Sequence, residues 1–290
     1  MSAAGPAVKG WCPGAYRPMM SGDGLVVRVR PRLARLTRRQ VEGLCDLAGR
    51  HGNGFIDLTN RANLQIRGVS EAGHGAVLRG LAALHLLDSD PQMEGRRNIL
   101  TAPFWTPGDL TTRLTDALLD ALPDLPELPA KVGFAVDAGP QPLLGGDSAD
   151  FRFERGASGL ILRADCCALG RPVTEATAIP ALIELAQWFD HHRTPARRRM
   201  AQVIDATALP AGWAVAAPLA PAPTPAPVAE PAPASASAPA PTATPAPAPA
   251  PEPTPVPPDS TSASARRIQF RSVSAFRNLS SSMRQLPIRS

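Results

Sequence analysis

A short stretch of the chain, DLTNRANLQIRG from Asp57 to Gly68, concentrates side chains that could bind an anion. On an earlier segment Arg28 and Arg30 alternate with Val27 and Val29, so both arginines point to the same face of a predicted strand. Guanidiniums on one face repel one another unless anions lie among them. Arginine binds carboxylates through two parallel hydrogen bonds, so the pattern predicts a ligand with several carboxylates. The candidate ligand-binding residues are Arg28, Arg30, Arg61, Asn63, Gln65, Arg67, Arg96, Arg97 and Lys131.

Ordinary structural roles could explain the same residues. Arginines on strands are often solvated or paired with acids, and Asp23, Asp57 and Glu94 are available here. Asn63 and Gln65 lie beside a predicted turn, where such side chains often satisfy backbone groups. The spacing leaves both interpretations open, and it does not name the anion.

Hydrophobic patterning in the first third of the chain predicts strands over residues 24–31, 54–60 and 63–69, with helices over 36–52 and 76–89. The resulting order is β-α-β-β-α, the start of a ferredoxin-like unit. The candidate anion-binding residues lie mostly on these three strands and on the turn between the second and third.

The following segment predicts an α+β body that extends to about residue 205. We expect a short strand or loop at 96–103 and a helix at 108–128 that stops at Pro123. A further helix is expected at 174–192, kinked or begun at Pro180, with a turn or two after it. Between these helices we expect an antiparallel meander of the segments 131–139, 150–155 and 159–166.

The C-terminal quarter has a different composition. Between Pro221 and Pro258, 16 of 38 residues are proline and most of the others are alanine, which predicts a semi-extended linker. Residues 265–290 contain six arginines and no acidic residue, and we expect a disordered tail or a weak amphipathic helix. Without these arginines the formal net charge of +5 falls to about −1, so charge alone does not predict a nucleic-acid-binding body.

Cysteine usage and hydropathy predict a cytoplasmic protein. Cys12, Cys45, Cys166 and Cys167 have no metal-ligand spacing, so the sequence predicts free thiols and no metal site. We find no run of 18 apolar residues and no secretory signal at the start of the chain.

Four motifs occur in an order that resembles the N-terminal half of the sulfite/nitrite reductase family, whose members carry a tetrapyrrole beside a [4Fe-4S] cluster. They are GDGLVVRVRP, LTNRANLQIRG, RRNIL and LPAKVGFAVD. GWCPGAYRPMMSGDGL and GDSADFRFER resemble one branch of that family, the precorrin-3B synthases. The resemblance covers about residues 9–205.

The resemblance implies that the nine candidate residues clamp the acidic side chains of a tetrapyrrole. Where the reductases have a second lysine, two places after the first, this chain has Gly133, which fits a tetrapyrrole other than sirohaem. The implied substrate is precorrin-3A, and the implied reaction is an oxygen-dependent hydroxylation with lactone formation in aerobic cobalamin biosynthesis. The implied cofactors are a [4Fe-4S] cluster and an iron centre.

The chain also departs from the family pattern. The four cluster cysteines of C-x5-C and C-x3-C type are absent, and the β-α-β-β-α pattern does not recur. We therefore expect an apparently truncated enzyme that is incomplete alone, with a separately encoded second half as partner and its catalytic activity uncertain. The alternatives are a non-catalytic tetrapyrrole-binding module or an inactive remnant. The expected segments are 1–20 (N-terminal), 21–90 (ferredoxin-like half domain), 91–205 (incomplete reductase domain), 206–264 (Pro/Ala-rich linker) and 265–290 (basic tail).

Overall fold

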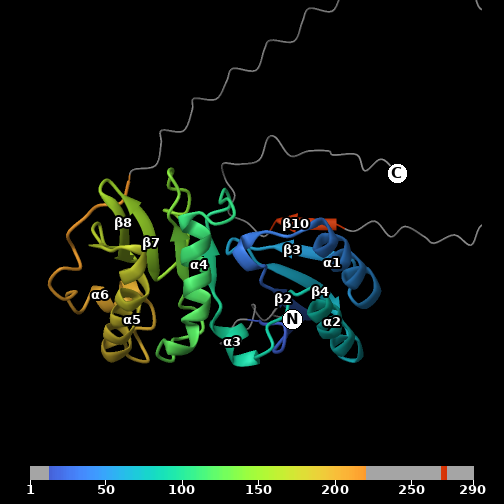
Figure 1. Ribbon diagram of the computed structural model, residues 1–290. Helices are drawn as coiled ribbons and strands as arrows, with labels where there is room; N and C mark the ends of the chain where they lie inside the picture. The colour runs from blue at the N-terminus through green and yellow to red at the C-terminus, as the bar shows by residue number, and fades with distance from the viewer. Residues whose placement is uncertain (1–12, 220–268, 273–290) are drawn as a thin grey trace, which may run out of the picture. The chain divides into compact units, whose positions relative to one another are not determined.

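The chain folds into two five-stranded β-sheets with helices packed against them, which confirms the predicted α+β class. The computed structural model describes residues 13–219 and 269–272 and is drawn as a ribbon in Figure 1. Both sheets belong to the same packed unit of the chain.

The first sheet has the predicted β-α-β-β-α order at its centre. Its strands are β1 (Met19–Ser21), β2 (Gly24–Val29), β3 (Phe55–Leu58), β4 (Leu64–Val69) and β10 (Gln269–Ser272), in the spatial order β1-β2-β4-β3-β10. β2 and β3 each pair antiparallel with β4 and therefore run parallel to each other. Parallel strands need a crossover connection, which α1 (Arg38–His51) supplies, and α2 (Glu71–Ala83) follows β4.

Alternation along the strands separates an apolar face of this sheet from a polar one. Val27 of β2 and Ile66 of β4 are fully buried against Leu44 of α1 and Leu81 of α2. Both helices lie on this apolar face (Figure 1). Burying each such side chain stabilises the fold by about 1.5–3 kcal/mol, and a register slip of one residue would bury the arginines instead. The apolar core thus fixes which face carries the guanidiniums.

Two helices in this region differ from the sequence-based expectation. α2 begins at Glu71 rather than near residue 76, because the Ser70 side chain accepts a hydrogen bond from Gly73 N at 3.0 Å and caps the helix. The short helix α3 (Pro91–Arg96) was not predicted. It is capped by Asp90 and is too short to show a helical period. The expected short strand follows it as β5 (Ile99–Thr101).

The second sheet is mixed, and the predicted antiparallel meander is wrong in part. It contains β5, β6 (Phe134–Asp137), β7 (Phe151–Gly156), β8 (Gly159–Ala164) and β9 (Arg171–Pro172), in that spatial order. β6 pairs parallel with both β5 and β7, whereas β7, β8 and β9 are antiparallel. The long connection 138–150 carries the chain back to the same end of the sheet, which a tight hairpin could not do.

Helices cover one face of this second sheet (Figure 1). They are α4 (Leu110–Asp120), α5 (Glu175–His192) and α6 (Met200–Ile204). Two short 3-10 turns, η1 (Arg32–Ala34) and η2 (Leu122–Asp124), lie elsewhere in the chain. Phe151 lies at the centre of the core, stacked on Phe134 at 5.4 Å and edge-on to Phe189 at 5.9 Å. α5 begins at Glu175, with Thr174 as its cap, and continues through Pro180.

A buried ion-pair network holds the 138–150 connection to β7. The Arg152 side chain is 1% exposed; its Nε donates to Glu154 Oε1 at 2.8 Å and its Nη1 to Asp147 O at 2.8 Å. Glu154 also accepts from Arg163 of β8. Burial would raise the pKa of Glu154, but the hydrogen bonds and charges of Arg163 and Arg152 outweigh burial and lower it.

The C-terminal expectations need two corrections. Residues 206–219 belong to the folded body rather than to the linker, because Trp213 is 3% exposed in the second core and backbone bridges join Ala216 and Pro218 to that sheet. Residues 269–272 form strand β10, parallel to β3, instead of a disordered tail or a helix. The other residues of the expected linker and tail lie outside the described part of the chain. No helix in residues 13–219 could cross a bilayer.

We predict that Glu154→Gln lowers the free energy of unfolding at pH 7 by about 3–5 kcal/mol, because the buried Arg152 loses the nearer of its two carboxylate partners, Glu154 at 2.8 Å rather than Asp165 at 3.5 Å. The pKa of Glu154 is lowered in the folded state. Its contribution to the free energy of unfolding is therefore present above the unfolded-state pKa and is lost as pH falls through the folded-state pKa. Urea unfolding at several pH values should show the loss shrinking below about pH 4.

The matched control is Glu42→Gln. Glu42 is exposed on α1 and pairs with exposed Arg38, so its loss should change stability by no more than about 0.5 kcal/mol. A Glu154→Gln penalty that is the same at every pH would contradict the ionic origin of the effect.

Candidate functional site

Three guanidiniums gather where β2 ends, and among the described residues two carboxylates, those of Glu94 and Asp88, pair with them. Arg30 is 7% exposed and Arg97 8% exposed, while Arg28 is half-buried on β2. Arg30 Nη1 donates to the Glu94 carboxylate. Arg97 donates to Asp88 Oδ2 from Nε at 3.0 Å and from Nη2 at 2.9 Å, and its Nη1 donates to Arg30 O at 2.9 Å. We call Arg28, Arg30 and Arg97 the guanidinium cluster.

Two donors of the guanidinium cluster are buried without a partner. Among the described residues nothing accepts a hydrogen bond from the Nε of Arg28 or of Arg30. Burial is the largest cause that lowers the pKa of Arg30; the charges of Arg28 and Arg97 lower it further, and Glu94 opposes them. A buried, unpaired donor costs about 1–3 kcal/mol, so an anion placed at these Nε groups would recover that cost.

The Glu94 carboxylate joins three separate segments at this point. Both of its oxygens accept from Ala15 N at 3.1 Å, and Oε1 also accepts from Arg30. The segment before β1 can approach because residue 14 is glycine: a Cβ there would lie 2.5 Å from Glu94 Oε2. His74 Nε2 lies 2.8 Å from Ala15 O on the other side of the same loop. This loop thus holds Glu94 against Arg30.

Arg67 pairs with acidic side chains of the protein, which is the structural alternative that the sequence left open. Its Nη2 lies 3.1 Å from Asp23 Oδ1, and its Nε lies 3.7 Å from Asp57 Oδ2. Gln65 stands between Arg28 and Asp57 in the strand register. The pairing of arginines with Asp23, Asp57 and Glu94 is therefore confirmed for Arg67 and Arg30, and Arg67 has less charge to offer a ligand.

Arg61, Asn63 and Lys131 lie where the β3–β4 hairpin meets the second sheet. Arg61 Nη2 donates to Ser148 Oγ at 3.2 Å, and its Nη1 lies 3.4 Å from the backbone oxygen of Lys131. Ala62 packs against the apolar residues at that contact. Lys131 is exposed, and Asn63 is 7% exposed beside Arg30 and Arg97. The structure thus brings together residues that are 70 positions apart in the sequence.

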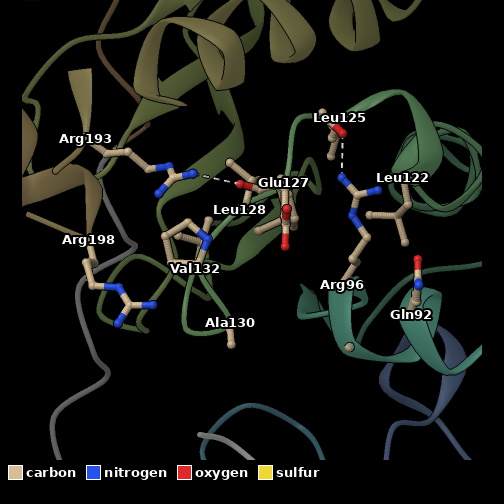
Figure 2. A pocket seen from close by; sticks show the side chains of 13 residues that line it. Gln92, Arg96, Leu122, Leu125, Glu127, Leu128, Ala130, Val132, Arg193 and Arg198 are labelled. Atoms are coloured by element: carbon tan, nitrogen blue, oxygen red, sulfur yellow. Dashed lines mark hydrogen bonds between the residues drawn. The ribbon is translucent and has the colours of Figure 1, made fainter. Parts of the chain in front are cut away.

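Arg96 points away from the guanidinium cluster, into a hollow of about 890 Å³. Figure 2 shows this hollow, with Arg193 and Arg198 on the opposite side of the segment 127–132 from Arg96. Arg193 and Arg198 were not among the predicted site residues. The sequence feature that could have pointed to Arg198 is the run of three arginines at 197–199, shortly after the end of a helix. A second hollow of about 560 Å³ adjoins the first and is lined by Arg30 and Glu94.

The thiols of the described residues do not fit an iron–sulfur cluster. Cys166 and Cys167 are adjacent and Cys45 is on α1, and the described residues contain no group of three or more Cys, His, Asp or Glu suited to a metal ion. Burial raises the pKa of all three thiols, which opposes the thiolate form that iron needs. Cys12 lies outside the described residues.

Comparison with known proteins supports the predicted resemblance. Residues 17–84 match the family described as the nitrite/sulfite reductase ferredoxin-like half domain. The chain is 32% identical over 180 residues to a precorrin-3B synthase from Sinorhizobium sp. That match covers 60% of this chain and 38% of the relative's length. The resemblance to precorrin-3B synthase is thus confirmed, and residues 17–84, with the strand order above, form a ferredoxin-like half domain.

We predict that Gly14→Ala destabilises the chain by about 1–3 kcal/mol, the usual cost of overpacking a buried site. The added Cβ would lie 2.5 Å from Glu94 Oε2, and that carboxylate is held by Ala15 N and Arg30. Thermal or urea unfolding measures the change. Gly22→Ala is the control because a Cβ there meets nothing within 4 Å. Equal stability of the two variants would show that Glu94 is not fixed against this loop.

Proposed function

We propose that this chain binds a polycarboxylated tetrapyrrole of the precorrin class through the guanidinium cluster. The observation that carries the proposal is the pair of buried, unpartnered Nε donors on Arg28 and Arg30, beside a third guanidinium on Arg97. A carboxylate bound there would gain charge-assisted hydrogen bonds and would relieve repulsion among the three cations.

The tetrapyrrole is proposed from the resemblance, because the cluster itself specifies only an anion. The matched relative is named a precorrin-3B synthase, so we infer a role in the synthesis of that pigment and hence in cobalamin biosynthesis. The proposed substrate is precorrin-3A, and the proposed reaction is its oxygen-dependent hydroxylation with lactone formation. In this proposal the residues of this chain bind the substrate's carboxylates and orient its ring.

A second candidate is a binding role without redox chemistry in this chain. The observation that favours it is the arrangement of the described thiols, which does not suit four-thiolate ligation. The guanidinium cluster needs no cluster cysteines to bind an anion. In the catalytic case a separately encoded partner would supply the iron–sulfur ligands.

We predict that Arg28→Leu weakens pigment binding by about 1–3 kcal/mol, roughly 5- to 150-fold in Kd, while leaving the free energy of unfolding unchanged or raised. Stability should not fall, because no described residue pairs with the Arg28 side chain and its buried Nε is already unsatisfied. The measurement is a spectrophotometric titration of the full chain with precorrin-3A, with sirohaem as comparator, alongside urea unfolding.

Arg39→Leu is the matched control, since Arg39 is exposed at the start of α1 and should leave Kd unchanged. If wild-type chain binds neither pigment, or if Arg28→Leu binds as tightly as wild type, the proposed role of the cluster is wrong. A binding loss that accompanies unfolding of Arg28→Leu would also contradict it.

A further inference from the structure

The two hollows adjoin at α3 and share Gln92, Gly95 and Ala130 in their linings. Within this helix of six residues, Glu94 faces Arg30 and Arg96 faces the larger hollow. The hollows are therefore contiguous, with one guanidinium site at each end. We propose that a single tetrapyrrole spans both, with a second carboxylate-binding subsite formed by Arg193 and Arg198 and with Arg96, on the other side of the segment 127–132, as a further cationic contact. This inference rests on the proposed function.

The larger hollow suits the body of such a ligand. Its lining mixes apolar residues, among them Leu128, Pro129 and Ala130, with polar and charged ones. Its volume of about 890 Å³ lies within the range of roughly 300–1,000 Å³ that is usual for small-molecule sites. A lining that mixes apolar and cationic side chains fits a molecule that has a hydrophobic macrocycle and carboxylates at its edge.

Hydrogen bonds to backbone oxygens, and for Arg193 also to a carboxylate, hold two of the rim arginines. Arg96 Nη2 donates to the carbonyls of Leu125 and Pro126, and Figure 2 shows the first of these bonds. Its Nε and Nη1 have no hydrogen-bond partner among the described residues. Arg193 donates to Glu127 O at 3.2 Å and to Asp190 Oδ1 at 2.6 Å. Both side chains are thus oriented before a ligand arrives, which limits the entropy that binding costs.

Arg198 is the least restrained of the three. It is exposed, and among the described residues no hydrogen bond or ion pair involves its side chain. Glu127 is the only carboxylate in the lining of this hollow and is itself exposed. Asp190 neutralises Arg193 in part, so the positive charge that remains for an anion lies mainly on Arg96 and Arg198. Arg198 is the best residue to test, because its removal breaks no contact within the described chain.

The test compares Arg198→Ala with Arg197→Ala in the full chain. Arg197 is the adjacent arginine, which is also exposed and does not line the hollow. Stable porphyrins serve as probes: the octacarboxylate uroporphyrin I and the dicarboxylate mesoporphyrin. We expect Arg198→Ala to weaken uroporphyrin binding about tenfold, in line with one lost charge-assisted contact, and mesoporphyrin binding much less. Arg197→Ala should change neither affinity.

Removal of a negative charge from the rim provides a second test of the subsite. Glu127→Gln removes the acid that lines the hollow and whose carboxylate is not paired with Arg193, and it should tighten uroporphyrin binding by a few fold. If Arg28→Leu weakens uroporphyrin binding but Arg198→Ala and Glu127→Gln leave it unchanged, the pigment does not span the two hollows, while the proposed function stands. If Arg28→Leu has no effect or the wild-type chain binds no porphyrin, the proposed function fails and this inference fails with it. Equal losses in Arg197→Ala and Arg198→Ala would overturn the subsite as well.

Discussion

The contact between Glu94 and Arg30 is the constraint on which the rest of the site depends. It joins the end of β2, the loop before β1 and helix α3, three segments that are distant in sequence. A buried charge pair is costly to desolvate and contributes little net stability, but removal of either partner is expensive. The contact therefore acts mainly to fix positions: it places α3, and with it Arg96, relative to the polar face of the first sheet.

The structure keeps a cationic centre that folding alone would not favour. Burial and mutual repulsion oppose the charge on Arg30, and two Nε donors remain unsatisfied. Elsewhere the same chain satisfies buried arginines fully, as Arg152 shows with two backbone oxygens and Glu154. This contrast within one molecule argues that the guanidinium cluster is arranged for a ligand, because sites that bind ligands commonly carry local instability.

The half domain could be predicted from sequence because its strands are rich in β-branched residues and its helices are long enough to show a period. The short helix α3 and the parallel pairing of β6 with β7 could not, since both depend on contacts that are distant in sequence. For the site, the sequence offered Asp23 as a possible partner for an arginine but could not assign it to Arg67, because the two residues are 44 positions apart. The sequence showed Gly133 only as the place where the reductases have a second lysine. The structure adds that a Cβ there would lie 2.7 Å from Asn98 Nδ2, so close packing restricts that position.

Binding of a ligand carboxylate by the buried Nε donors of Arg28 and Arg30 can be observed through the NMR signals of the arginine Nε–H groups in the full chain. These signals are recorded with and without saturating uroporphyrin I. If the two orphan donors form the anion site, the Arg28 and Arg30 Nε–H resonances should shift downfield and exchange more slowly with water once the ligand binds. The Arg152 Nε–H group already donates a hydrogen bond to Glu154, so its resonance should not change. Saturable binding that leaves the Arg28 and Arg30 signals unchanged would contradict the account.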